Sequence, residues 1–226
     1  MTSPSDPLHI AIIPDGNRRW AAKHLLKPWN GHEKAVENFR TLTEWCRRDP
    51  RVGTLTVWCF STENWKRDRE EVDHLMRLLE EYLRQERKGF LKEKTRLLHS
   101  GRRDRIPATL ATLLEDVTEE TKDQTEFTLN LAVDYGGKDE ILRAIGKLKD
   151  REATEESLRS HLDHPELPDL DLVIRTSGEQ RTSNFFLWQS AYAEWAFVDT
   201  FFPDFTTDDL AKSVNDFSAR ARRFGS

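Results

Sequence analysis

Hydrophobic and polar positions along the chain repeat with two different periods. Six short runs are apolar and rich in β-branched or aromatic residues, which is typical of buried strands. Longer stretches between them carry apolar residues every three or four positions, as on one face of an amphipathic helix. The predicted strands are 8–14, 54–60, 95–99, 127–133, 170–174 and 195–198, and the predicted helices are 31–49, 69–93, 105–122, 137–149, 154–163 and 207–223.

The order of these elements predicts the fold class. Strands that alternate with helices favour a largely parallel sheet flanked by helices. No repeat, low-complexity tract or long linker divides the 226 residues. We therefore expect an α/β fold with one six-stranded sheet in a single domain at 8–226, after a flexible N-terminus at 1–7.

Clusters of polar residues follow several of the predicted strands. In an open α/β sheet ligands bind outside the carboxyl ends of the strands, so loops from separate strands are expected to converge on one crevice. The clusters are 14–20 after the first strand, 60–67 after the second, 134–138 after the fourth and 175–181 after the fifth.

The first cluster combines a carboxylate with two guanidinium groups. Backbone N–H groups at a helix N-terminus favour an anion, and Arg18 or Arg19 adds charge-assisted bonds to a phosphate. Asp15 repels a bare phosphate, which suggests a bridging cation, most simply Mg²⁺. The alternative is an ordinary strand-exit turn with solvated arginines, because Asp-Gly is common turn chemistry.

Further positive charge lies in the later clusters. Arg175 and Arg181 bracket a Thr-Ser-Gly turn, and Ser183 follows two residues later. Such a group suits a diphosphate, which needs several directional donors. Together with Arg19 and Arg67, these arginines supply enough charge for two phosphorylated ligands.

Several of these residues also have structural interpretations. The arginines can pair with Glu63, Glu179 or surface acids. His32, predicted to open the second helix, is by itself more typical of a cap or the surface. Glu194 lies among aromatic residues, where a buried acid needs a partner or a metal, and an arginine would serve as well.

The third helical segment carries an apolar stripe. Residues at three- and four-residue steps form it: Val72, Leu75, Met76, Leu79 and Leu83. The stripe either packs in the core or lines an apolar groove. A phosphate site beside an apolar groove fits an amphiphile with a diphosphate head and a hydrocarbon tail.

Composition limits the classes of function. A formal net charge of -5 gives no support to a general nucleic-acid binder, so no nucleic-acid partner is expected. Cys46 and Cys59 have no paired Cys or His at zinc spacing, which suits a reducing cytoplasm. No signal pattern or membrane-length apolar run is present. We expect a cytoplasmic protein that makes at most peripheral membrane contact, for product release.

Together these strings resemble the cis-prenyltransferases, the undecaprenyl diphosphate synthase family. The resemblance runs in the family's order from about residue 8 to 225, and it is carried by 9–21, 60–65, 129–137, 174–181, 183–194 and 222–225.

The resemblance implies a homodimer with a hydrophobic tunnel above the sheet. It implies a Mg²⁺-dependent reaction in which isopentenyl diphosphate adds to an allylic diphosphate and each new double bond is cis. Asp15 would organise Mg²⁺, with Glu194 as a further metal contact, while Arg19, Gly16 and Asn17 hold the allylic diphosphate.

The resemblance also implies roles for the other matched residues. His32 would assist the allylic diphosphate, and Arg175, Arg181 and Ser183 would bind isopentenyl diphosphate. The remaining expected site residues are Ser61 and Asn64 near the reacting centre, Arg18, Trp20, Phe60, Glu63, Trp65 and Arg67 along the substrates, and Arg223 and Gly225 toward the partner subunit.

The chain departs from the family pattern at a few positions. Pro28 stands where many relatives carry a second Arg, with Lys27 beside it. The other departures are Cys59 and Val36 at tunnel positions and Glu80 and Glu81 on a helix that is more apolar elsewhere. These changes shorten the product or suit a different acceptor.

Several alternatives therefore stay open. The proton acceptor is a diphosphate oxygen or a group beside Asn64, and product length and primer are not fixed. A short or branched product is the second hypothesis. A non-catalytic partner subunit is the third, disfavoured because such partners lose first-motif residues while Asp15, Asn17 and Arg19 are all present.

Overall fold

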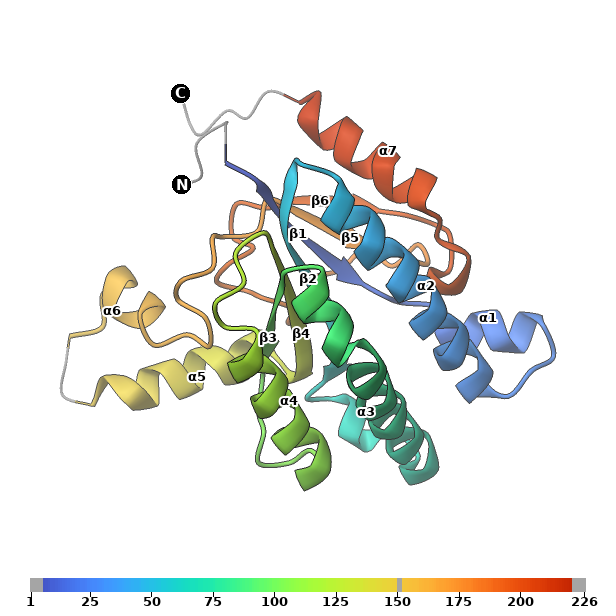
Figure 1. Cartoon of the computed structure of the whole chain (residues 1–226), viewed down its shortest axis with the longest axis horizontal. Helices are drawn as coiled ribbons and strands as arrows, with labels where there is room; N and C mark the ends of the chain where they lie inside the picture. Colours follow the sequence, from blue (N-terminus) through green and yellow to red (C-terminus); the bar gives the residue numbers. More distant parts are fainter. Residues whose placement is uncertain (1–5, 150–151, 221–226) are drawn as a thin grey trace.

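The computed structural model describes residues 6–149 and 152–220, which form one six-stranded sheet with helices on both faces (Figure 1). The strands are β1 (Leu8–Ile13), β2 (Val52–Ser61), β3 (Thr95–Ser100), β4 (Phe127–Tyr135), β5 (Leu172–Arg175) and β6 (Glu194–Phe197). The helices are α1 (Asn17–Lys23), α2 (Pro28–Arg48), η1 (Asn64–Lys66), α3 (Arg69–Lys92), α4 (Ala108–Glu120), α5 (Gly137–Leu148), α6 (Glu155–Arg159), η2 (Phe202–Asp204) and α7 (Thr207–Ser218).

The sheet is parallel throughout, with strand order β3-β4-β2-β1-β5-β6. The prediction of an α/β fold with a parallel six-stranded sheet is confirmed. Residues Ile10–Ile13 are at most 4% exposed, as expected where helices cover both faces. From β1 the chain passes to β2, then to the edge strand β3, and back to β4, which lies between β2 and β3. It then crosses to the other side of β1, where β5 and β6 follow.

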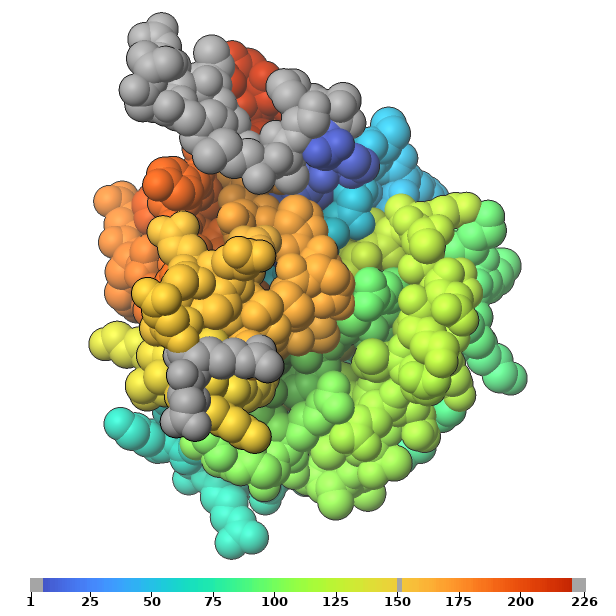
Figure 2. Space-filling view, turned by 90° about the vertical axis from the view of Figure 1, so that its left-hand side faces the viewer, coloured from blue at the N-terminus to red at the C-terminus, as the bar shows by residue number. Residues whose placement is uncertain are grey.

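Two apolar layers cover the sheet. The larger core packs α2, α3, α4 and α7 against one face, and the side chains of Ile10 and Ile12 point into it. Ala11 and Ile13 point to the opposite face, where Phe185 and Phe186 cover them. The region of α5 and α6 and the chain that follows lie side by side on the flank shown in Figure 2.

A chain of buried hydrogen bonds crosses four strands within the sheet. The Ser100 hydroxyl donates to Asn130 Oδ1 (3.0 Å), and the Asn130 amide donates to Thr56 Oγ1 (3.2 Å). Thr56 Oγ1 lies 2.8 Å from His9 Nε2, and His9 Nδ1 donates to the carbonyl of Pro168. We call these four side chains the polar ladder.

Element ends differ from the predictions mainly where proline acts. The second helix begins at Pro28 rather than residue 31, because proline is well suited to the first helical turn. Helix α4 begins only after Pro107. Helix α6 ends at Arg159, four residues early, and α7 ends at Ser218. Within the described residues, no helix combines the length and apolarity needed to cross a bilayer.

Candidate active site

The polar clusters meet at the carboxyl ends of β1, β2 and β5. Ile13 at the end of β1 pairs with Arg175 at the end of β5, and Asp15 follows two residues later. Ser61 ends the neighbouring strand β2. The strand order divides at β1: β2, β4 and β3 lie on one side of it, and β5 and β6 lie on the other. This edge is therefore the switch point at which α/β sheets bind ligands.

A buried arginine and a partly exposed carboxylate form the centre of the site. Arg175 donates to Asp15 Oδ2 from Nη2 (2.6 Å) and from Nε (3.1 Å). Its Nη1 donates to Ser183 Oγ (2.8 Å) and to the carbonyl of Arg181. The Arg175 side chain is 4% exposed and that of Asp15 is 37% exposed. Asp15 thus neutralises the Arg175 guanidinium, which stays protonated even when buried. The Asp15 side chain itself remains accessible from the cavity.

Two further arginines share one carboxylate. Arg19 Nη2 donates to Ser177 Oγ (2.6 Å) and lies 2.9 Å from Glu179 Oε1, and Arg181 pairs with the same carboxylate. The Arg181 hydrogen bond is the main cause that lowers the Glu179 pKa. The sequence left open whether the arginines pair with Glu179, and in the structure Arg19 and Arg181 both do. Arg19 and Arg181 stay about half exposed.

The turn before α1 brings backbone close to this charge. Gly16 has φ +100°, and a Cβ there would lie 2.8 Å from Phe201 Cδ1 and 2.9 Å from Ser177 Cβ. Only glycine fits this approach. Asn17 then starts α1, and its buried Oδ1 has no hydrogen-bond partner among the described residues. The start of α1 thus offers backbone N–H groups to an anion, as the sequence predicts.

Glu71 was missed in the sequence analysis. It lies on the first turn of α3 and is 8% exposed. Its Oε1 is 3.2 Å from His32 Nε2 and 3.1 Å from Arg67 Nη1, and its Oε2 is 3.9 Å from Arg18 Nε. The i,i+4 spacing of Arg67 and Glu71 is the sequence signal that could have indicated it.

His32 is 5% exposed and faces the cavity from α2. It lies in the second turn of that helix, not at its start, because the helix begins at Pro28. Burial lowers its pKa more than the hydrogen bond to Glu71 raises it. His32 is therefore a neutral, oriented imidazole at neutral pH, rather than a surface cap.

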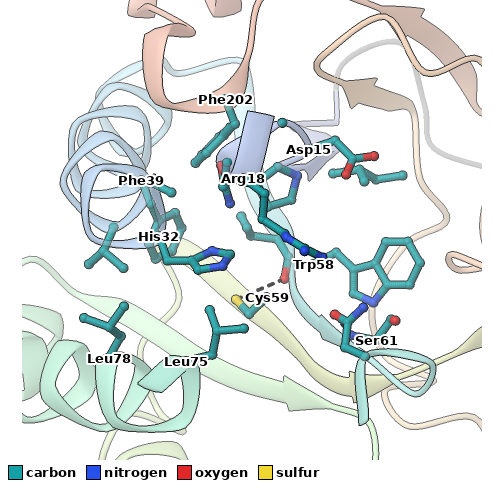
Figure 3. Close-up of a pocket in the computed structure, with 18 of the residues that line it drawn as sticks. Asp15, Arg18, His32, Phe39, Trp58, Cys59, Ser61, Leu75, Leu78 and Phe202 are labelled. Carbon is teal, nitrogen blue, oxygen red and sulfur yellow. Dashed lines mark hydrogen bonds between the residues drawn. The ribbon is translucent and has the colours of Figure 1, made fainter. Parts of the chain in front are cut away.

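An apolar arm extends the site between α2 and α3. The whole cavity encloses about 1030 Å³. Figure 3 shows His32 and Phe39 from α2 opposite Leu75 and Leu78 from α3, with Cys59 of β2 between them. Its apolar walls are Ala35, Val36, Phe39, Val57, Leu75, Leu78, Leu79, Tyr82 and Phe202. The expected tunnel thus has a counterpart, a cavity that joins the charged pocket to an apolar interior.

The α3 stripe divides between core and cavity. Leu75 and Leu79 line the cavity, whereas Val72, Met76 and Leu83 pack in the core. Of the departures from the family pattern, Val36, Cys59 and Pro28 line the cavity. Glu80 instead accepts hydrogen bonds from Arg84 and Thr109, and Glu81 is exposed. The charge of these two acids therefore does not enter the apolar arm.

Most of the predicted site residues come together in this cavity. Those that line it are Asp15, Gly16, Asn17, Arg18, Arg19, His32, Ser61, Glu63, Asn64, Arg67, Arg175 and Ser183. Asn64 Oδ1 accepts from the Ser61 N–H (3.0 Å), and Glu63 accepts from Asn184 (3.2 Å). Glu63 thus binds an amide, not one of the arginines.

Other predicted residues lie behind the lining or elsewhere. Phe60 is in the core, where Trp65 packs edge-on against it and donates to Asp134 Oδ1 (2.8 Å). Trp20 donates to Asp204 Oδ1. These three aromatic residues shape the site from outside rather than contact its interior. Arg223 and Gly225 lie outside the described residues.

Glu194 does not join Asp15 within this chain. It pairs in register with Leu172, three residues before Arg175, so it lies about 10 Å from the site along the strand direction. Its Oε2 is 2.6 Å from Arg220 Nε. The arginine partner that the sequence left as an alternative is present, and a metal contact from this chain's Glu194 has no support here.

The donor set at Asp15 fits Mg²⁺. The described residues hold no cluster of three or more His, Cys, Asp or Glu side chains that would bind a metal alone. Mg²⁺ is usually bound by one or two carboxylates together with substrate phosphates and water. Asp15, partly exposed beside Arg19 and the start of α1 and hydrogen-bonded to Arg175 through Oδ2, offers such a carboxylate.

Comparison with known proteins identifies the family. The family model described as "Putative undecaprenyl diphosphate synthase" matches residues 13–225, and the chain belongs to this prenyltransferase family. Isoprenyl transferase of Aquifex pyrophilus is 46% identical over 97% of this chain and 96% of its own.

Two solved structures share the fold. Lavandulyl diphosphate synthase from Lavandula x intermedia, in complex with dimethylallyl diphosphate, has a TM-score of 0.91 and 32% identity over 97% of this chain and 98% of its own. A probable undecaprenyl diphosphate synthase from Campylobacter jejuni has a TM-score of 0.83 and 34% identity over 98% and 100%. Family and fold agree with the resemblance drawn from the sequence.

Proposed function

We propose that this protein is a Mg²⁺-dependent cis-prenyltransferase that joins isopentenyl diphosphate to an allylic diphosphate. The observation that carries the proposal is the joining of an arginine-rich pocket around Asp15 to an apolar cavity between α2 and α3. Such a site suits a diphosphate head and a hydrocarbon tail. Membership of the prenyltransferase family supports the same chemistry.

The charged groups divide between two diphosphates. The start of α1 and Arg19 suit the allylic diphosphate, since backbone N–H groups and a guanidinium converge there. Arg175, Arg181 and Ser183 suit isopentenyl diphosphate. Glu179 joins the two sets, because it pairs with both Arg19 and Arg181. It sets their spacing before the substrates arrive, which is the preorganisation that two-substrate reactions need.

The reaction needs alignment rather than an activated nucleophile. The allylic carbon–oxygen bond breaks and diphosphate leaves, the alkene of isopentenyl diphosphate forms the new carbon–carbon bond, and a proton is then lost. Asp15 would hold Mg²⁺, which when bound would neutralise charge on the leaving diphosphate. The proton acceptor is a diphosphate oxygen or a group beside Asn64.

The same proposal covers assembly and location. We propose a homodimer, supported by the edge position of β6, where Trp195 and Phe197 stack and Phe197 is 40% exposed. Phe202 is 2% exposed and belongs to the core, so it is not available for such an interface. We also propose a cytoplasmic location with peripheral membrane contact.

The test is incorporation of radiolabelled isopentenyl diphosphate with a panel of allylic primers, with Mg²⁺ or EDTA, and products resolved by length and double-bond geometry. We expect Mg²⁺-dependent products with cis additions. No incorporation with any primer would refute the proposal.

A short or branched product is the second candidate. It is favoured by the TM-score of 0.91 to a lavandulyl diphosphate synthase. Incubation with dimethylallyl diphosphate alone tests for a branched product made from two allylic diphosphates, because chain elongation needs isopentenyl diphosphate. A short elongation product is recognised by the length of the labelled chain. The third hypothesis, a non-catalytic subunit, is disfavoured because Asp15, Asn17 and Arg19 all line the cavity.

A further inference from the structure

Two leucines stand out from the surface between α1 and α2. Leu25 is 95% exposed and Leu26 is 46% exposed. The turn is ordered by its own backbone: the N–H of Leu25 donates to Ala22 O (3.1 Å) and the N–H of Leu26 to Ala21 O (2.8 Å). This is the Schellman pattern that ends helices.

Leu25 occupies a position that favours glycine. Its φ is 58°, the left-handed region that a Schellman turn requires. A leucine here is strained, and its exposed side chain contributes little to the fold. Neither local backbone preference nor core packing explains the residue, which points to a contact outside the chain.

Positive charge surrounds these leucines. From Arg18 to His32 the sequence has four lysines and arginines, two histidines and no acidic residue, although the whole chain carries a net charge of -5. Lys23 and Lys27 flank the leucines, and the Nζ atom of Lys27 lies 4.7 Å from the ring centre of Trp29. A basic tip with apolar and aromatic side chains matches the boundary of an anionic bilayer.

The turn also adjoins the cavity. Ala22 before it and Pro28 after it both line the cavity, and Figure 1 shows the turn at the right-hand edge of the molecule. We propose that the α1–α2 turn, residues 24–27, together with the flanking Lys23 and Trp29, docks on an anionic lipid surface and places the cavity mouth against the membrane. The benefit for release of an amphiphile rests on the proposed function, whereas the docking itself does not.

The small size of the tip favours a lipid partner over a protein. A stable protein interface buries about 800 Å² on each side. Two leucines on a protruding turn supply only a fraction of this, but they suffice for weak insertion when lysines add attraction to anionic headgroups.

The test measures sedimentation of the full-length chain with vesicles of phosphatidylcholine, with and without phosphatidylglycerol. We expect binding only to the anionic vesicles. Leu25→Gly relieves the strained φ, so the melting temperature should not fall, yet vesicle affinity should fall roughly tenfold. Lys23→Gln and Lys27→Gln should each weaken binding roughly fivefold. Leu142→Ser, at a 68% exposed leucine on α5, is the matched control and should bind normally.

Three outcomes would overturn the inference: wild-type protein that ignores anionic vesicles, Leu25→Gly that binds as wild type, or Leu142→Ser that loses as much. Light scattering adds a fourth, because a changed oligomeric state in Leu25→Gly would make the turn an interface between copies. Prenyl transfer in detergent is assayed separately, so failure of docking and failure of the proposed activity are distinguishable.

Discussion

Asp15 serves two charges at once. It neutralises the buried guanidinium of Arg175 through Oδ2, and it faces the cavity where a diphosphate and its cation are expected. Arg175 and the cation would compete for Asp15 only if the cation needed both carboxylate oxygens. Because Arg175 binds a single oxygen, both partners can be held together.

We expect Asp15→Ala to lower turnover by roughly 10²–10³-fold or more, the usual loss when electrostatic stabilisation of a leaving group is removed. Asp15→Asn keeps an oxygen for Arg175 and isolates the effect of charge. Steady-state kinetics at several Mg²⁺ concentrations, with circular dichroism to verify folding, would measure it. Unchanged activity in either variant would contradict the role given to Asp15.

Glu71 acts on the site through its neighbours. Glu71→Ala leaves the buried His32 donor and the Arg67 guanidinium without their acceptor, so unfolding free energy should fall by about 1–3 kcal/mol. Glu71→Gln keeps an acceptor and should recover most stability. If the role is positioning, the KM for the allylic substrate should still rise in Glu71→Gln. Urea unfolding and kinetics on both variants test this, and an unaltered KM would leave Glu71 a purely structural residue.

Helices α2 and α3 form the walls of the apolar arm. Phe39 and Tyr82, with ring centres 5.0 Å apart, approach each other between the helices, and Tyr82 is 3% exposed. The length available to a growing chain is therefore set by side chains on two helices and not by the sheet alone.

A larger side chain in this space should shorten the product. Val36 lines the cavity, so the larger side chain in Val36→Phe would occupy part of the cavity volume. We expect the longest product to lose at least one isoprene unit, measured by chromatography of the labelled products. Thr41→Phe, on the exposed part of the same helix, is the control and should leave the distribution unchanged. An unaltered product length in Val36→Phe would contradict the assignment of this cavity to the chain.

Local sequence patterns predicted the presence of strands and helices better than the residues at which they begin and end. Apolar runs identified all six strands, most clearly β1 and β5, whose residues are buried on both faces of the sheet. The start of α2 was missed, because Pro28 fits the first turn of a helix as well as the loop before it. The sequence did not predict which leucines of α3 line the cavity. A helical stripe indicates which face of the helix is apolar, but it does not give the distance to the facing helix.

Two buried histidines link stability of the whole molecule to pH. Burial lowers the pKa of His9 and of His99 to about 4. His9 accepts from the Thr56 hydroxyl in the polar ladder, so a proton on its Nε2 would break that chain of bonds. The unfolded chain takes up these protons near pH 6.5, so protonation favours unfolding.

The free energy of unfolding should fall as pH drops from about 6.5 to about 4, by roughly 3 kcal/mol for each of these histidines. Urea denaturation across this range measures the slope. Carboxylates add a fall of the same sign at the acid end, so His99→Gln provides the comparison. A slope in His99→Gln as steep as in wild type would show that this histidine does not contribute.

The arrangement of the strands and loops in the whole molecule was harder to predict from sequence than the individual elements. Convergence of the clusters followed from the rule for parallel sheets and holds after the first, second and fifth strands, for Asp15, Ser61 and Arg175. It does not hold for the cluster 134–138 after the fourth strand, which does not line the cavity. Strand order was not predictable, because it depends on which crossovers pack best. The distance of Glu194 from Asp15 within the chain was likewise not predictable, since it is fixed by the register of β6 on β5.

The pairing of Asp15 with Arg175 also determines when this site can exist during synthesis. The two residues are 160 positions apart in the chain. At the usual pace of translation, the N-terminal strand waits roughly 8–30 s for β5 to emerge from the ribosome. The edge of β1 that later pairs with β5 is open during that time, and unpaired strand edges make a nascent chain prone to aggregation. Any truncated product that ends before β5 leaves β1 at the edge of the sheet and lacks Arg175, so it cannot form the site.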